Sequence, residues 1–206
     1  MAYTAQLTAA LSGASMRQLG YWRRTAAFTP EIRSVRPIFY SFRDIAALRA
    51  FVFLRQETSL QSIRAAIASL RGLGELEHLS RYKLVANGGT VIVRLGDDVV
   101  DLVRLPGHGL VADFSEVLAE FTMATGATVP NLRRPRPHVT VDPAMRGGHP
   151  VIAGTRVPFE LVAGLVEDGV APEDVALFYP GVDAAAACDA ADFALYVATH
   201  SEAPAA

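Results

Sequence analysis

Residues 147–158 of this 206-residue chain read GGHPVIAGTRVP, and this stretch decides how the last third of the chain folds. The glycine pair at its start permits positive φ angles, and Gly154 permits a second tight turn. Val151 and Ile152 are typical of a short, half-buried strand. Pro158 suits the first position of a helix, where a missing N–H leaves no bond unmade. The stretch therefore predicts a tight hairpin that leads into a helix.

Three helices are expected after this hairpin. Apolar residues recur at helical spacing from Leu161 to Val166, and Gly169 ends the first helix. The second begins at residues 171–174, whose carboxylates favour the positive end of a helix dipole, and it ends before Pro180. The third is rich in alanine and covers residues 183–199. Two helices around a glycine turn, followed by a third, predict a small helix-turn-helix fold.

Residues 139–197 resemble the bacterial domain-of-unknown-function family 433. Its recurring core is a GG-x-P-x-I-x-GTR-[IV]-P run, then a helix, a glycine turn and a Tyr-Pro pair, which Tyr179 and Pro180 supply here. Members commonly resemble antitoxins that are encoded beside a toxin of the PIN-like ribonuclease type. The resemblance implies that this region binds such a toxin, and the expected partner-binding residues are Glu160, Glu167 and Asp168.

The charge is divided between the two ends of the chain. Residues 1–74 hold ten arginines and three carboxylates, a net charge of +7, whereas the remainder holds nine basic and eighteen acidic residues, a net charge of −9. A basic end suits a polyanion such as nucleic acid, and an acidic end suits a basic protein surface. We therefore expect the two ends to face different partners and to separate functionally.

Composition places the chain among folded, soluble proteins. Hydrophobic residues make up 51% of it, enough to bury a core in one or two domains. The single cysteine, Cys188, cannot form an internal disulfide, and the first basic residue is Arg17, so no secretory leader is expected. No apolar run approaches the ~20 residues of a membrane helix. A cytoplasmic location without membrane contact is expected.

The beginning of the chain predicts another helix-turn-helix. A helix over residues 4–11, a turn at residues 12–14 and a helix capped by Ser15 follow one another. Trp22 in the second helix is expected in the core. That helix otherwise carries the mixture of side chains that reads base edges and binds phosphates. The segment after this helix adds two more such residues. The expected DNA-binding residues are therefore Ser15, Arg17, Gln18, Tyr21, Arg23, Arg24, Arg36 and Tyr40.

Two further features complete this first domain. Residues 32–40 predict two short strands that form a wing, with Pro37 forcing an edge position. Capping-box sequences at residues 41–44 and 58–61 then open two helices that pack on the wing and the helix pair.

Over residues 4–71 this order resembles the winged helix-turn-helix of the MerR superfamily. Residues 13–19 match its G-[VA]-S-x-R-x-L motif, and a Tyr-Trp pair and Tyr40 match its later positions. Gly20 and Ile38 stand where that family often has arginines. The resemblance implies a DNA-binding domain over residues 1–75.

The middle of the chain predicts a small sheet. Strands over residues 82–86 and 90–94 flank an Asn-Gly-Gly turn, a third strand covers residues 99–105, and a helix from about residue 113 to 122 follows. Such a meander can hardly bury both sheet faces, so we expect it to pack against a neighbour or a second copy. Residues 130–137, with three arginines and three prolines, read as an exposed linker.

The predicted fold class is α+β and mainly helical. It comprises a winged helix-turn-helix over residues 1–75, a β-meander module with a linker over residues 76–137, and a helix-turn-helix-like domain over residues 138–206. This order resembles antitoxins of VapBC-type operons. The resemblance implies a homodimer that binds operator DNA, represses its own operon and neutralises a PIN-like ribonuclease toxin. The alternative is a MerR-like regulator that answers a small molecule bound near residues 82–122.

An enzyme is not predicted, because no acid, base and nucleophile converge in the sequence. His149 is expected as a turn residue, and the remaining histidines are scattered. No cluster of cysteines or histidines indicates a metal site, and no cofactor is expected.

Overall fold

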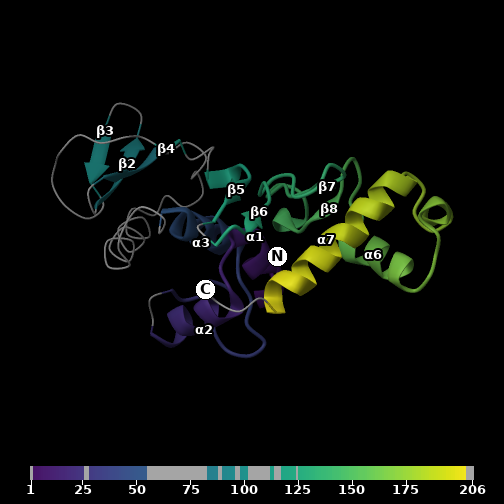
Figure 1. Ribbon diagram of the computed structural model, residues 1–206, viewed down its shortest axis with the longest axis horizontal. Coiled ribbons are helices and arrows are strands. Elements are labelled where there is room, and N and C mark those ends of the chain that lie inside the picture. Colours follow the sequence, from purple (N-terminus) through teal and green to yellow (C-terminus); the bar gives the residue numbers. More distant parts are fainter. Residues whose placement is uncertain are drawn as a thin grey trace.

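The computed structural model describes residues 2–25, 28–54, 83–87, 90–95, 98–101, 112–113, 117–123 and 125–202. Helices at both ends of the described chain flank small antiparallel sheets in its middle (Figure 1), so the predicted α+β class is confirmed. The long last helix, α7 (Ala184–Glu202), runs from the far end of the carboxyl-terminal region back to the first helices.

The first two helices form as predicted. α1 (Ala5–Ser12) is capped by the Thr4 side chain and ends at Gly13, whose φ of +80° is left-handed. A Cβ atom on Gly13 would lie 2.6 Å from a methyl carbon of Val129, so the turn requires glycine both for its backbone angle and for close packing. α2 (Met16–Arg24) follows directly after Ser15.

α3 (Phe42–Leu54) opens with the predicted capping box. The Oγ of Ser41 accepts the N–H of Asp44 at 3.0 Å, and Oδ2 of Asp44 accepts the N–H of Ser41 at 2.9 Å. Ile45, Leu48 and Phe51 bury the apolar face of this helix, as their spacing predicts.

The wing is shorter than predicted. Within residues 28–54, pairing between extended segments is limited to single bridges, Arg33 with Phe39 and Tyr40 with Tyr3. Pro37 has no N–H to donate, and this loss prevents a continuous ladder over residues 32–40.

The central sheet has four antiparallel strands in the order β3-β2-β1-β4. They are β1 (Lys83–Asn87), β2 (Thr90–Leu95), β3 (Asp98–Asp101) and β4 (Ala112–Asp113). Asn87 pairs with Thr90, so the predicted Asn-Gly-Gly hairpin is confirmed. β3 begins one residue before its predicted start, and β4, which pairs with β1, was not predicted. Residues 102–105 of the predicted third strand lie outside the described residues, as does the helix predicted from residue 58.

The helix predicted over residues 113–122 is wrong at both ends. Asp113 belongs to β4, and β5 (Phe121–Thr122) pairs with β6 (Thr128–Val129). Gly126, with φ of +82°, donates its N–H to the Met123 carbonyl at 2.8 Å and closes this hairpin. The apolar spacing suits a helix, but β-branched residues on both sides of a glycine turn favour paired strands here.

The GGHPVIAGTRVP motif folds largely as predicted. β8 (Val151–Ile152) pairs with β7 (Val139–Thr140), and Ile152 donates its N–H to the Val157 carbonyl at 2.9 Å across the turn. A short 3-10 turn, η2 (Arg146–Gly148), precedes β8. α6 (Phe159–Glu167) begins after Pro158, which stands at its cap and not in its first turn.

The remaining two helices also occupy their predicted places. Gly169, with φ of +94°, follows the end of α6. The second predicted helix is the 3-10 helix η3 (Pro172–Leu177), a geometry that is common in short helical segments. α7 then covers the third.

The two ends of the chain share one hydrophobic core. α7 packs on α1 as well as on α6. Leu11 and Leu48 from the first helices belong to the same buried cluster as Phe159 and Phe193 from the last ones. The ends are therefore not independent in structure, although their separation in function stays a prediction. The domain boundaries at residues 75 and 137 stay predictions too.

The exposed linker predicted over residues 130–137 is wrong. Pro130 and Leu132 are buried, and Leu132 donates its N–H to the Leu118 carbonyl at 2.8 Å. Arg133 and Arg134 are exposed as expected, but Arg136 packs against α7. The proline-rich segment is thus part of the core, because its apolar side chains point inward between the arginines.

Candidate nucleic-acid interface

α2, the predicted recognition helix, begins with a complete capping box. The Oγ of Ser15 accepts the N–H of Gln18 at 3.2 Å, and Oε1 of Gln18 accepts the N–H of Ser15 at 2.8 Å. Both residues were predicted to contact DNA, yet the box already uses both side chains. Its physical effect is to fix the direction of the first turn of α2.

One face of α2 presents positive charge to the solvent. Arg17, Tyr21 and Arg24 follow one another at spacings of four and three residues, and all three are exposed, Tyr21 to 47%. Trp22 lies on the opposite face and is buried, with its ring edge-on to that of Phe51 at 4.4 Å between centroids. The predicted core role of Trp22 is confirmed. The outward face therefore carries two guanidinium groups on either side of a phenol.

Arg23 and Tyr40 do not share this outward position. Arg23 is half-buried, and its Nη1 donates to the Ser34 carbonyl at 3.3 Å, so it holds the wing against α2. Tyr40 is only 2% exposed, and its backbone exchanges hydrogen bonds of 2.9 and 3.0 Å with Tyr3. Burial raises the pKa of Tyr40, and the Arg23 charge partly opposes this rise. The prediction of a DNA contact by Tyr40 is wrong, because its side chain lies in the core.

The wing adds exposed groups beside α2. Arg36, an expected DNA-binding residue, is exposed, and so is Arg33. Two aliphatic side chains between and next to them, Ile32 at 45% and Val35 at 63%, are also exposed. The sequence analysis did not predict that these two side chains are exposed, because the sequence indicates it only by their alternation with arginines. Aliphatic groups on a basic surface suit contact with thymine methyl groups.

Arg49 is a buried residue that sequence reasoning missed. It is 0% exposed, and its guanidinium donates to the carbonyls of Leu11 at 2.7 Å and Ala119 at 2.6 Å, as well as to that of Val117. Burial lowers its pKa from 12.5 to about 9, so the group is still charged at neutral pH. The charge also lies 4.9 Å from the centroid of the Phe121 ring. Because Leu11 is in the last turn of α1, Arg49 fixes the point where the turn before α2 begins.

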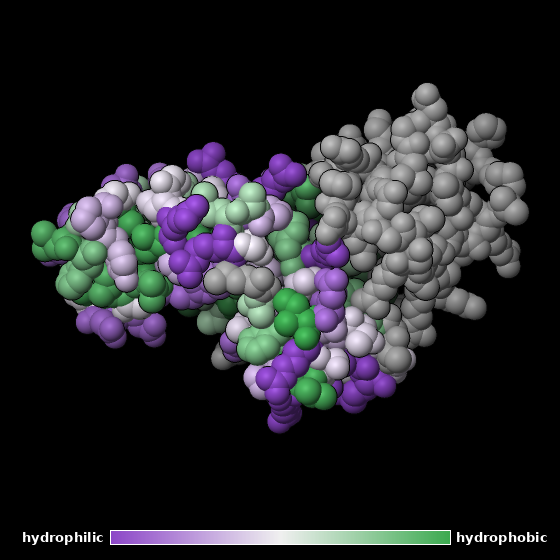
Figure 2. Space-filling view, turned by 180° about the vertical axis from the view of Figure 1, so that it is seen from behind, coloured by the Kyte–Doolittle hydropathy of each residue, from purple (hydrophilic) through white to green (hydrophobic). Residues whose placement is uncertain are grey.

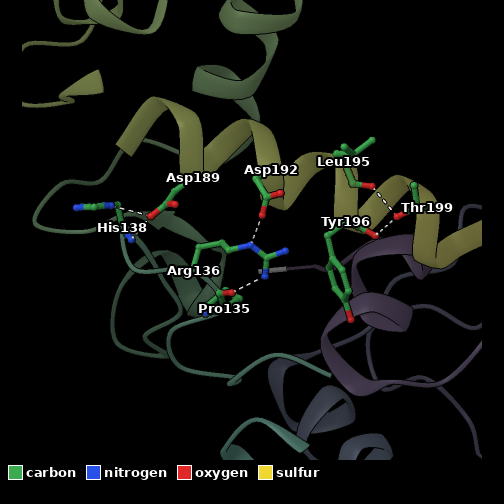
Figure 3. A network of polar contacts seen from close by, with 8 residues as sticks. All are labelled: Pro135, Arg136, His138, Asp189, Asp192, Leu195, Tyr196 and Thr199. Atoms are coloured by element: carbon green, nitrogen blue, oxygen red, sulfur yellow. Dashed lines mark hydrogen bonds and ion pairs between the residues drawn. The ribbon is translucent and has the colours of Figure 1, made fainter. Parts of the chain in front are cut away.

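Polar contacts hold the proline-rich segment against α7 (Figure 3). Arg136 pairs with Asp192 and lies 5.2 Å from the centroid of the Tyr196 ring. One carboxylate oxygen of Asp189 lies 2.7 Å from Nδ1 of His138 and accepts the His138 backbone N–H at 2.8 Å.

The last turns of α7 contact the first helix-turn-helix. The hydroxyl of Tyr196 lies 3.3 Å from the carbonyls of both Ala10 and Thr128, and burial raises its pKa to about 12. One turn later, the His200 ring lies near the backbone of Ala14, in the turn before α2. Burial lowers the pKa of His200, and the interaction with the Ala14 backbone partly opposes the effect. α7 therefore connects the carboxyl-terminal region directly to the base of the recognition helix.

The predicted partner-binding carboxylates lie on α6 and at its end. Glu167 and Asp168 are exposed. Glu160 is exposed too, but its carboxylate lies 2.9 Å from Nε2 of His149. His149 is thus more than the turn residue predicted, since it links the motif to α6 and its ring lies 6.4 Å from that of Phe159.

No three His, Cys, Asp or Glu side chains in the described part of the chain are grouped to hold a metal ion. Among the described helices, none is long and apolar enough to cross a membrane.

Comparisons with known proteins match parts of this chain. Residues 139–194 match the family described as "Protein of unknown function (DUF433)", so the resemblance stated for this region is confirmed there. The chain is similar to the uncharacterized HTH-type transcriptional regulators Mb1861 of Mycobacterium bovis and Rv1830 of Mycobacterium tuberculosis, each 32% identical over 124 residues. That match covers 54% of this chain and 55% of each relative, so the chain spans about half the length of the curated relatives it matches.

The fold also resembles a solved structure. The crystal structure of Rv2018 from Mycobacterium tuberculosis covers 92% of this chain, and 96% of that chain is covered in return, with a TM-score of 0.51. At 18% sequence identity, this likeness concerns the fold alone.

Proposed function

We propose that the chain is a DNA-binding transcription regulator that acts as the antitoxin of a type II toxin-antitoxin system. A cytoplasmic homodimer would place one α2 in each half-site of its own operator, repress the operon and neutralise a PIN-like ribonuclease toxin. The names of the curated relatives, HTH-type transcriptional regulators, support the regulatory part.

The observation that carries the DNA-binding part is the outward face of α2. Arg17, Tyr21 and Arg24 project together from a helix whose start is fixed by its capping box, and the segment that carries the exposed Arg36 is bonded to this helix through Arg23 and the Ser34 carbonyl. Guanidinium groups bind phosphates and guanine edges, and a phenol contacts bases and sugars. The net charge of +7 over residues 1–74 attracts a polyanion to this end.

The antitoxin part rests on the opposite charge of the other end and on the family match. Residues 157–206 contain nine carboxylates and no lysine or arginine. Phosphates repel such a surface, whereas a ribonuclease holds its anionic substrate in a basic groove that attracts it.

The DNA-binding part predicts distinct effects for two exposed arginines. Arg24→Ala should lower the salt dependence of operator binding by about one phosphate contact per subunit, whereas Arg17→Ala should weaken binding by roughly 1–3 kcal/mol and relax base preference. Arg156→Ala is the matched control, since Arg156 is exposed in the carboxyl-terminal region. The measurement is fluorescence anisotropy with a duplex from upstream of the gene and a scrambled duplex, at several salt concentrations.

Equal binding by the wild type and both α2 variants would show that these arginines of α2 do not contact the operator. Light scattering on the same samples measures the dimer, and a monomer at every concentration would contradict it. Operator binding without inhibition of the neighbouring gene's nuclease would favour the MerR-like, ligand-responsive alternative.

A further inference from the structure

The end of the molecule formed by α6 and η3 exposes large apolar side chains. Leu177 is 80% exposed, Phe178 56% and Leu161 51%. Leu161 belongs to α6, Leu177 is the last residue of η3, and Phe178 follows it. α6 and η3 are in contact with each other. Figure 2 shows strongly hydrophobic side chains gathered at this end of the molecule, with hydrophilic ones beside them.

The backbone around η3 holds Leu177 and Phe178 outward. Val175 is the buried anchor of the turn at 0% exposure. Its carbonyl accepts the N–H groups of both Phe178 and Tyr179 at 3.0 Å, and Val182 donates to the Tyr179 carbonyl at 3.0 Å. Because these bonds fix the turn, the two apolar residues cannot fold back onto the core without breaking them. Binding a partner would therefore cost little conformational entropy at this surface, because its backbone is already ordered.

The charges around these residues select the chemistry of the partner. Glu167, Asp168, Glu173 and Asp174 are exposed in α6, η3 and the loop between them. A second copy placed face to face on this surface would bring like charges together, and nucleic acid would be repelled. A protein surface with an apolar pocket surrounded by lysine and arginine is complementary to both features.

We infer that Leu177 and Phe178, flanked by Leu161, form the anchor by which this chain binds a basic protein. This inference rests on the proposed function: the partner is the ribonuclease toxin, and the anchor occupies an apolar pocket at the margin of its basic substrate groove. The carboxylates around the anchor accelerate encounter with the partner. The apolar side chains, once they are buried in the complex, slow its dissociation.

The test uses the full-length chain and the purified product of the adjoining reading frame. The double variant Leu177→Ser with Phe178→Ser should weaken binding by about 100-fold, mainly through faster dissociation. Leu195→Ser is the control: the exposed fraction of Leu195, 63%, lies between those of Phe178 and Leu177, and the residue is about 16 Å along α7 from its first residue. Binding kinetics, inhibition of ribonuclease activity and melting temperature are measured for each protein.

A second variant tests the charges separately. Glu167→Lys with Asp168→Lys should slow association by roughly tenfold and weaken its salt dependence, without changing the melting temperature much. Glu160 is left intact, because its contact with His149 contributes to the fold.

The outcomes separate the inference from the function. If the wild type inhibits the nuclease and the serine variant inhibits it equally well, the anchor is wrong and the antitoxin function stands. If the wild type neither binds nor inhibits that product, the antitoxin function fails, and the anchor fails with it. A serine variant that becomes monomeric in light scattering would make this surface a subunit contact and overturn the inference.

Discussion

Arg49 shows how one side chain can organise a whole turn. A charge in a core normally needs a carboxylate, but this guanidinium is satisfied by backbone carbonyls of α1 and of residues 117–119. Leu11 and Val117 are buried, so their carbonyls depend on this donor more than that of the half-buried Ala119 does. The residue therefore joins α3, the end of α1 and the segment before β5.

Replacing this residue should cost a large part of the free energy of unfolding. In Arg49→Met the carbonyls of Leu11, Val117 and Ala119 lose charged donors, and removal of a desolvated charge offsets only part of that loss, so we expect destabilisation of roughly 3 kcal/mol. Urea unfolding measures it. Arg24→Met, at an exposed site, should stay within about 0.5 kcal/mol of wild type. A similarly small effect at residue 49 would mean that water or rearrangement satisfies the carbonyls.

At the scale of elements, substitutions at the cap of α2 can distinguish an effect on helix stability from an effect on DNA contact. Ser15→Ala should remove one bond of the capping box and cost about 1 kcal/mol. Ser15→Asp and Ser15→Asn should both restore the cap, but the aspartate adds a negative charge next to the expected phosphates. We therefore expect equal melting temperatures for these two variants and weaker operator binding for the aspartate alone. Equal binding by both would place the start of α2 away from DNA.

The sequence predicts well those elements that are determined by residues close to one another in the chain. The Ser15 and Ser41 caps, the turn at Gly13 and the Asn87 hairpin depend on neighbours along the chain, and each forms in its predicted place. Failures occur where distant contacts decide the outcome. Arg136 looks like a linker residue until Asp192, 56 residues away, gives it a partner, and the acceptors of Arg49 lie 38 to 70 positions away.

The candidate site follows the same rule. The outward position of Arg17, Tyr21 and Arg24 follows from helical spacing and is predictable. The burial of Tyr40 is not predictable in this way, because it depends on pairing with Tyr3, which precedes α1 and is distant in the sequence. The exposure of Leu177 likewise depends on which side of η3 meets the core, and a short 3-10 helix has too few residues to show this by periodicity.

At the scale of the molecule, α7 joins the two proposed surfaces. It begins next to η3 and ends at the turn before α2, where Tyr196 contacts Ala10 and His200 contacts Ala14. Charge divides the chain into a basic and an acidic part, but the core does not, since Leu11 and Phe193 share it. Deleting the last helix would therefore expose α1, and point substitutions are the better means of testing each surface.

The contact between α7 and the turn should depend on pH through His200. Burial lowers its pKa in the folded protein below the ordinary value of 6.5, so the unfolded chain binds more protons as the pH falls through that value. Stability from the neutral, buried ring is thus complete above about pH 6.5 and is lost on acidification. His200→Gln keeps a hydrogen-bonding side chain near Ala14 without this titration, so its melting temperature should fall less than that of the wild type between about pH 7.5 and about pH 5.5. Thr199→Ala, at an exposed neighbour, should retain the wild-type pH dependence. An identical fall in the glutamine variant would assign the acid sensitivity to other groups and leave His200 without a role in it.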